Sequence, residues 1–245
     1  MSFLSHLHTE LRRTLLTRRG ATHRPEDVPI GTHKEYPRME RIPLPETPLL
    51  DTSIGDVLRD RRSAHAIAAH PALSLDDWGA LFGNALRKKT GSTNRMYPSG
   101  GALYPIETYV IGDVGTMPGS IFHYHPTANA FELLWEVPPQ LSIKSLAPRP
   151  ESLMFSALIV FTAVWERSSA KYGDLAYIHS LLEAGHMSGN LLLAATALGI
   201  AARPMAGFVD DALVQLLEID EEKEQPVHSI VVGRAVSSGI EVTEE

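Results

Sequence analysis

Residues 95–107 read Arg-Met-Tyr-Pro-Ser-Gly-Gly-Ala-Leu-Tyr-Pro-Ile-Glu and lead directly into an apolar stretch at 108–111. Two prolines and two adjacent glycines predict a rigid turn with little side-chain bulk, followed by a strand. Gly100 and Gly101 can adopt positive φ and let a ligand lie against the backbone, and Ser99 adds a hydroxyl. One glycine would satisfy the geometry of such a turn. The stretch therefore predicts a binding surface for a flat cofactor.

The composition is that of an ordinary globular protein. Its 245 residues, 44% hydrophobic and 21% charged, are enough for one full-sized core. The net charge of -7 argues against general binding to nucleic acid or to an anionic membrane. The chain has no cysteine, which excludes disulfides, thiolate catalysis and cysteine metal sites. A signal-peptide pattern is missing, and no apolar run approaches the roughly 20 residues that span a bilayer, so we expect a cytoplasmic protein.

Hydrophobic periodicity predicts one α+β domain preceded by an arm. Apolar residues recur at helical spacing in 3–19, and six prolines in 25–48 predict an extended segment that is neither helix nor central strand. We divide the chain into an N-terminal helix and proline-rich arm (1–50), a main domain (51–236) and a C-terminal tail (237–245). Helices are expected at 54–61, 75–86, 175–198 and 211–218. Strands are expected at 108–111, 121–124, 130–135, 157–165 and 227–233, and a further short strand is expected to end at 208.

A basic group follows the first short helix of the main domain. Arg61, Arg62 and Ser63 come directly after it, and His65 lies two residues beyond. Two guanidinium groups and a hydroxyl can clamp a phosphate, because arginine offers a fork of charged donors. Taken alone, these residues are better explained as a solvated basic helix end, which the helix dipole favours.

A polar stripe runs along the long helix expected at 175–198. It consists of His179, Glu183, His186 and Asn190, spaced by four, three and four residues and therefore on one helix face. The stripe could ligate a metal, or it could face a cofactor pocket, a subunit interface or buried water. No second element supplies further ligands, so we expect no metal. Gly185 and Gly189 on this helix predict close approach by another helix or by a ligand.

Lys171 and Tyr172 stand just before the expected start of the long helix. A lysine there lies near the positive end of the helix dipole, and burial together with that dipole would lower its pKa towards that of a general base. A neighbouring tyrosine can donate or relay a proton. Spacing alone favours the simpler alternative, two exposed loop residues.

The order of these motifs resembles the nitroreductase-like flavoproteins, and most of all the SagB/McbC-type azoline dehydrogenases that mature thiazole- and oxazole-containing peptides. The resemblance covers about residues 50–235. It rests on Arg-Arg-Ser at 61–63, Tyr-Pro-Ser-Gly-Gly-Ala-Leu-Tyr-Pro-Ile-Glu at 97–107, Glu-Ala-Gly-His-Met-Ser-Gly-Asn-Leu at 183–191, Gly-Phe at 207–208 and Val-Gly-Arg at 232–234. The Lys-Tyr pair matches the dehydrogenase subgroup. The resemblance implies an α+β nitroreductase-like fold, with a central mixed or antiparallel sheet flanked by helices, and an obligate dimer with FMN at the subunit interface.

The resemblance also assigns cofactor contacts. By this resemblance, the phosphate and ribityl chain of FMN are bound by Arg61, Arg62, Ser63 and Arg234. The isoalloxazine ring lies beside Pro98, Ser99, Gly100 and Gly101, and the N–H of Gly207 lies near flavin N5. Asn190 also belongs to the cofactor-binding residues. His65 also belongs to that set, but it departs from the family pattern, in which lysine or arginine is common. This departure weakens one flavin contact.

The implied chemistry is oxidation of an azoline ring in a modified precursor peptide. Lys171 removes a proton with help from Tyr172, a hydride passes to the flavin, and oxygen reoxidises it. Peptide recognition would depend on a cyclodehydratase partner. Two alternatives stay open: an NAD(P)H-dependent nitroreductase or quinone reductase acting on small molecules, which would not need Lys171, and a non-catalytic scaffold subunit that takes up no FMN.

Overall fold

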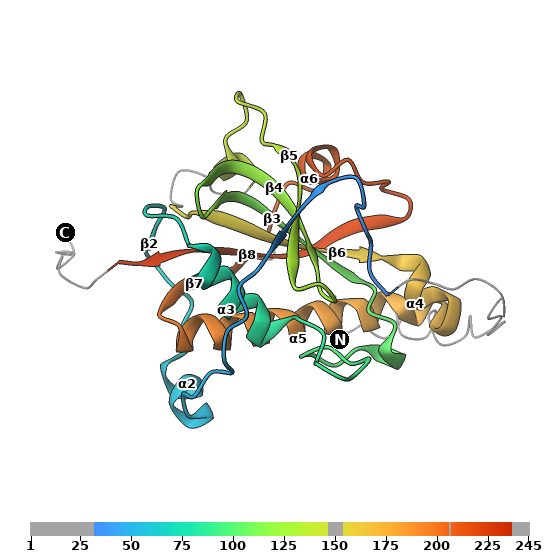
Figure 1. Cartoon of the computed structure of the whole chain (residues 1–245). Helices are drawn as coiled ribbons and strands as arrows, with labels where there is room; N and C mark the ends of the chain where they lie inside the picture. Colours follow the sequence, from blue (N-terminus) through green and yellow to red (C-terminus); the bar gives the residue numbers. More distant parts are fainter. Residues whose placement is uncertain (1–31, 147–153, 206, 237–245) are drawn as a thin grey trace, which may run out of the picture.

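The apolar stretch after the glycine turn becomes the middle of a large antiparallel sheet (Figure 1). The computed structural model describes residues 32–146, 154–205 and 207–236. Eight strands are ordered β1-β5-β4-β3-β6-β8-β2, and β7 also pairs with β8. All of the described strand pairs are antiparallel. The strands are β1 (Glu40–Pro43), β2 (Ile67–Ala68), β3 (Ile106–Val114), β4 (Met117–His125), β5 (Ala130–Glu136), β6 (Ala157–Val164), β7 (Ile200–Met205) and β8 (Glu224–Ala235).

Helices cover both faces of this sheet. The structure contains α2 (Ile54–Asp60), α3 (Leu75–Ala85), α4 (Trp165–Tyr172), α5 (Ala176–Ala197) and α6 (Asp210–Leu216), with short 3-10 turns at Gly100–Ala102, Ile143–Leu146 and Gly173–Leu175. The long helix α5 and the shorter α3 lie along one face, and α6 lies on the other (Figure 1). This arrangement confirms the α+β prediction, and the sheet is antiparallel.

The alternation of side chains along each strand divides the core into two layers. On β6, Ile159 packs in the layer of α3 and α5, whereas Val160 packs in the layer of α6. β6 lies between β3 and β8, and nearly all of its side chains are buried. The strand expected at 157–165 is therefore present, and it lies in the interior of the sheet.

A reciprocal side-chain cap holds the N-terminus of α3. Ser74 Oγ accepts a hydrogen bond from the Asp77 backbone N–H at 3.2 Å, and the Asp77 carboxylate accepts one from Ser74 N at 2.8 Å. This reciprocal pair is a capping box, which fixes where the helix begins.

One strand boundary was predicted wrongly, whereas the extended, non-central segment expected in the proline-rich arm agrees with the structure. The strand expected to continue through Trp165 ends at Val164, and an unpredicted helix, α4, begins there. The proline-rich arm also contributes the short strand β1, which pairs with β5 at the edge of the sheet, where proline is tolerated. The helix expected at 3–19 and the tail at 237–245 lie outside the described residues. Across the described part of the chain, no helix combines the length and apolar character needed to cross a membrane.

Candidate functional site

The turn predicted from the opening stretch is held by Ser99 and contains unusual backbone angles. Tyr104 N donates to Ser99 Oγ at 2.9 Å, and Ala102 N donates to Ser99 O at 3.1 Å. Gly101 has φ +63°, and Ala102 and Tyr104 have φ values of 54° and 50°. Positive φ is uncommon outside glycine and persists where the surroundings enforce it. The turn is therefore a rigid surface.

Lys171 and Tyr172 lie directly against this turn. A Cβ at position 101 would stand 2.7 Å from Lys171 Nζ and 2.7 Å from Tyr172 Oη. Glycine at position 101 is therefore favoured both by its φ and by the space that these two side chains occupy. Both residues belong to the last turn of α4, and Lys171 is exposed. The exposure of Lys171 agrees with the simpler alternative, although the pair is helical and not part of a loop, and the burial that would lower the lysine pKa is not observed.

A cavity of about 240 Å³ separates the turn from the first half of α5. Ser99 and Gly100 line one side, and His179 and Glu183 line the other. The His179 ring stands edge-on to the Tyr172 ring, with centroids 4.5 Å apart. His179 Nδ1 and Glu183 Oε1 are buried and have no hydrogen-bond partner among the described residues. Buried polar atoms of this kind favour a ligand or water that completes their hydrogen bonds.

The carboxyl of Glu183 lines this cavity and has a shifted pKa. Burial raises the pKa of its carboxyl to about 7, although a hydrogen bond with Ser99 and the charge of Arg95 act in the opposite direction. The group therefore changes protonation near neutral pH, as groups at functional sites often do. The sequence placed Glu183 on the polar stripe of the long helix but gave it no role. Its burial against the turn could not be read from spacing alone.

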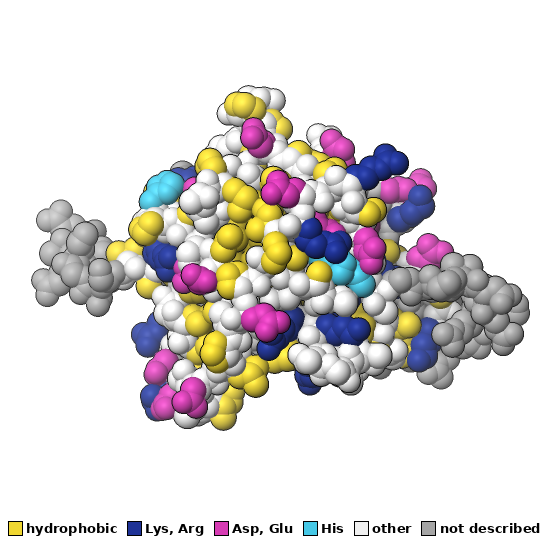
Figure 2. Space-filling model, viewed as in Figure 1, with side chains coloured by type: hydrophobic (Ala, Val, Ile, Leu, Met, Phe, Trp, Pro, Cys, Tyr) yellow, Lys and Arg dark blue, Asp and Glu magenta, His cyan; other side chains and the backbone are white. Residues whose placement is uncertain are grey.

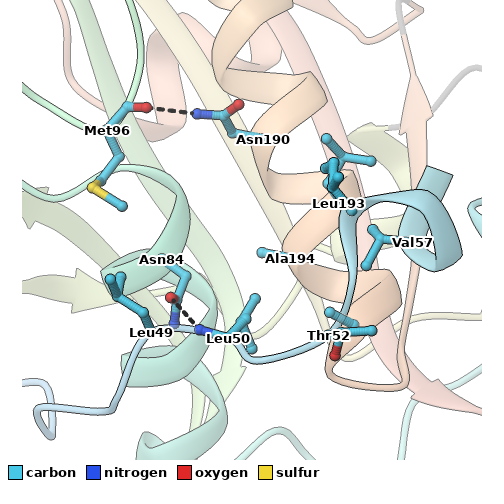
Figure 3. A pocket seen from close by; sticks show the side chains of 11 residues that line it. Leu49, Leu50, Thr52, Val57, Asn84, Met96, Asn190, Leu193 and Ala194 are labelled. Carbon is cyan, nitrogen blue, oxygen red and sulfur yellow. Dashed lines mark hydrogen bonds between the residues drawn. The ribbon is translucent and has the colours of Figure 1, made fainter.

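The residues predicted to bind a phosphate lie near the C-terminal end of α5. Arg61, Arg62 and Ser63 are exposed and follow α2, and the next residue is held by β7, since Ala64 N donates to Ala202 O at 3.0 Å. α2 contributes Val57 to a hollow that the second half of α5 also lines (Figure 3).

The two halves of the predicted cofactor site are therefore separated within one chain. The glycine turn faces His179, whereas α2 faces Leu193. These two α5 residues are 14 positions apart, which corresponds to about 21 Å along a helix. A single chain does not bring Arg61–Ser63 to the turn.

The remaining predicted residues have other surroundings. Arg234 Nη2 donates to Asp77 Oδ2 at 2.6 Å and to Ala72 O at 3.3 Å, which ties the end of β8 to the cap of α3. Asn190 Nδ2 donates to Met96 O at 3.0 Å and so holds the segment that leads into the turn (Figure 3). His65 and Gly207 are exposed.

One group of metal-type ligands was not foreseen. Among the described residues, His33, Glu35 and His125 bring ligand atoms within 4.8 Å of one another. However, His125 Nδ1 accepts a hydrogen bond from Ala128 N at 3.1 Å, so the neutral ring carries its hydrogen on Nε2, the atom that faces Glu35. A metal-binding histidine donates from its second nitrogen instead. This arrangement does not favour a metal.

Comparison with known proteins identifies the family to which the chain belongs. A model of the nitroreductase family matches residues 58–234. A protein of Methanocaldococcus jannaschii named after nitroreductases is 29% identical over 202 residues, which are 80% of this chain and 96% of that protein. The trifolitoxin-processing protein TfxB of Rhizobium leguminosarum bv. trifolii is 30% identical over 226 residues, which are 85% of this chain and 60% of TfxB.

A solved structure gives the same result. One chain of the Escherichia coli microcin synthetase McbBCD complex, with truncated pro-MccB17 bound, superposes with a TM-score of 0.67 and 25% identity, covering 78% of this chain and 76% of that chain. The matched segment includes the basic group, the glycine turn, α4 and α5. The chain therefore belongs to the nitroreductase family and is similar within it to the SagB/McbC type.

Proposed function

We propose that this protein is an FMN-dependent dehydrogenase that oxidises azoline rings of a ribosomally made peptide to thiazoles or oxazoles. The observation that carries the proposal is the position of Lys171 Nζ and Tyr172 Oη against the bare Gly101 backbone. A base and a hydroxyl beside a surface suited to a flat ring are the groups that proton removal next to a flavin needs. The similarity to a trifolitoxin-processing protein and to a peptide-bound microcin synthetase complex supports a peptide substrate.

The chain's residues have separate tasks in this reaction. A bound FMN would supply the hydride acceptor, and the ring would lose a hydride and a proton and become aromatic. Lys171 Nζ takes that proton, and Tyr172 Oη orients the lysine or the ring by hydrogen bonding. Because Lys171 is exposed, it can return the proton to solvent. Oxygen would reoxidise the flavin.

The residues present fit FMN if two chains share the site. The orphaned atoms His179 Nδ1 and Glu183 Oε1 lie beside the bare turn, where a ring with polar edges would satisfy them. Arg61 and Arg62 are exposed and offer charged donors for a phosphate. These two regions are too far apart for one FMN within a single chain. We therefore propose a homodimer in which one chain supplies the turn and its partner supplies the basic group.

The outer face of α5 supports this dimer. A Cβ at Gly185 or Gly189 would meet no atom of the described residues within 4 Å, so packing within the chain does not explain these two glycines. Leu182 on the same helix is 57% exposed. α2, which projects beside α5, carries exposed hydrophobic residues among charged ones, and side chains of these kinds gather at its place in Figure 2. Such a mixed surface suits a subunit interface.

Gly189→Leu should dissociate the dimer. Leucine improves helix propensity by roughly 0.8–1 kcal/mol over glycine, so the monomer should still fold, but its bulk would fill the space kept for the partner. Light scattering after gel filtration should show a monomer, and bound FMN should be lost. Gly189→Ala is the matched control, since it gains the same propensity and leaves most of the space. A dimer of Gly189→Leu with full FMN content would contradict the proposed interface.

Gly101→Ala should impair turnover more than folding. The new methyl group would collide with Lys171 Nζ and Tyr172 Oη, whose flexible ends can move away. The positive φ costs alanine about 1 kcal/mol, which thermal unfolding should detect as a small shift. Steady-state azoline oxidation should fall about tenfold or more, because displacement of a reacting group by about 1 Å is costly. Equal activity of Gly101→Ala and the unaltered protein would show that Lys171 is not held against the turn for catalysis.

The central experiment is reduction of the bound flavin by substrate. The purified protein should show flavin absorption, and an azoline-containing peptide added without oxygen should bleach it, with loss of one hydrogen pair from the peptide by mass spectrometry. Bleaching by NAD(P)H but not by the peptide would favour the alternative, a nitroreductase or quinone reductase, which the Methanocaldococcus jannaschii relative makes the second candidate. A colourless protein that takes up no FMN would instead indicate a scaffold subunit.

A cyclodehydratase complex is the proposed setting for the reaction. The similar chain of known structure was solved within a synthetase complex that holds a peptide. Azolines are the products of a cyclodehydratase, so the enzyme that makes the ring must deliver it here. Co-purification of the two proteins with a precursor peptide tests this association.

A further inference from the structure

Three buried charged side chains form a row on neighbouring strands of the sheet. Glu132 lies on β5, His123 on β4 and Glu107 on β3. His123 Nδ1 lies 2.9 Å from Glu132 Oε2, and His123 Nε2 lies 2.8 Å from Glu107 Oε2. Their side chains are at most 1% exposed. Isolated charges at this depth would be very unfavourable, so each must be paired.

An arginine closes each end of this row. Arg41 of the edge strand β1 bonds through Nη2 to Glu132 Oε1 at 2.6 Å. At the other end, Arg167 of α4 bonds through Nη2 to Glu107 Oε1. The row therefore runs from one edge of the sheet to the helix that carries Lys171.

Arg167 also contacts the glycine turn. Its Nη1 donates to Tyr104 O at 3.1 Å, and the side chain is 6% exposed. Tyr104 is the turn residue with φ 50° whose N–H binds Ser99 Oγ. One guanidinium group thus joins three elements: α4, β3 and the turn.

We propose that Arg167 is a positioning residue that holds α4 so that Lys171 and Tyr172 face the turn. The inference rests on the proposed function, in which Lys171 is the base. Lys171 follows Arg167 by four residues, so both lie on the same face of α4, one helical turn apart. Arg167 binds Tyr104 O, three residues beyond the glycine that Lys171 touches, so a shift of Arg167 changes the distance between base and turn.

Glu107 makes this anchor rigid. Its Oε1 also accepts a hydrogen bond from Lys34 N at 2.6 Å, and its Oε2 is engaged by His123, so the carboxylate cannot follow a displaced helix. The planar fork of arginine reaches two acceptors at once in a fixed geometry, whereas a lysine ammonium is a single point charge. A lysine here would neutralise Glu107 but would not hold the carboxylate and Tyr104 O in the same way.

The test is Arg167→Lys in the full-length protein with FMN. We expect kcat for azoline oxidation to fall on the order of 10- to 100-fold, with KM and FMN content close to those of the unaltered protein. The acetylation rate of Lys171, followed by mass spectrometry, should change as well. That readout does not depend on the reaction, so it reports on positioning even if the proposed substrate is wrong.

Arg41→Lys is the matched control. It makes the same replacement at the opposite end of the same row, away from α4, and should leave kcat and the acetylation of Lys171 unchanged. If both variants lower kcat equally, or if Arg167→Lys leaves both kcat and the acetylation rate of Lys171 unchanged, the positioning role is wrong. Should Arg167→Lys fail to fold, the double variant Arg167→Met with Glu107→Gln removes the charges of the pair together and should show the same fall in kcat. Full activity of a Lys171→Ala protein would instead reject Lys171 as the base, and an unaltered protein that does not oxidise an azoline peptide would reject the proposed function.

Discussion

Lys171→Ala is expected to reduce azoline oxidation by roughly 100- to 10,000-fold, the range that a positioned general base contributes. Lys171 Nζ is one of two polar groups that lie against the Gly101 backbone, and alanine leaves only the tyrosine hydroxyl there. Because Lys171 is exposed and lies in the last turn of α4, its loss should not disturb the core. Single-turnover reduction of the bound flavin by an azoline peptide measures the effect directly.

Lys89→Ala serves as the control for this variant. Lys89 is also exposed, and the two described bonds of its backbone, from its N–H to Asn94 O and from Ser92 N to its carbonyl, do not involve the side chain. Both variants should retain FMN and the same unfolding midpoint. If Lys171→Ala keeps full activity, Lys171 is not the base. If it loses FMN together with activity, Lys171 has a role in cofactor binding.

The glycine turn and most of the sheet were predictable from local sequence. Proline and glycine fix the backbone around residues 98–101 whatever surrounds them, and Ser74 with Asp77 caps a helix through contacts three residues apart. A continuous apolar run such as that of β6 has no stable place except between two other strands. In these cases the cause of the structure lies within a few residues.

The boundary between β6 and α4 was not predictable, because distant residues decide it. Val164 N donates to Pro105 O at 2.8 Å, and Trp165 N donates to Lys223 O at 3.0 Å. These two bonds end the strand and start the helix, and neither partner is near in sequence. Lys171 was consequently expected at the start of the long helix and lies at the end of another one.

The spatial division of the cofactor site was hidden for a similar reason. The resemblance implied that the motifs at Arg61–Ser63 and Pro98–Gly101 contact one FMN at a subunit interface, but their order in the sequence does not say which subunit supplies each motif. The structure places them near opposite ends of α5. Motif order reports which groups a site uses, but not which subunit provides each of them.

Glu107→Gln should lower the free energy of unfolding by about 3–5 kcal/mol, the range found when one partner of a buried ion pair is removed. The carboxylate is 1% exposed and has three partners: Arg167, His123 Nε2 and Lys34 N. Glutamine keeps the shape but leaves the buried Arg167 and His123 without their opposing charge. Urea unfolding at neutral pH measures the loss. Asp220→Asn, at an exposed pair with Lys223, is the control and should leave the free energy of unfolding almost unchanged.

The pH dependence separates charge from shape at Glu107. Burial acts to raise the pKa of Glu107, but the hydrogen bond from His123 and the charge of Arg167 outweigh it and lower that pKa from 4.5 to about 2. A carboxyl with a lowered pKa stabilises the fold above its ordinary pKa and loses this contribution as the pH falls through the folded value. Glutamine does not titrate, so the stability difference between the two proteins should shrink as the pH falls from 4.5 towards 2.

His123 titrates in the opposite sense. Burial acts to lower its pKa, but the hydrogen bonds to Glu107 and Glu132 outweigh burial and raise that pKa. His123 therefore contributes stability below pH 6.5, and this contribution is lost as the pH rises through its folded pKa. A stability difference between the two proteins that stays constant over the acid range would mean that packing holds the row together. In that case the charge of Glu107 would not be what anchors Arg167.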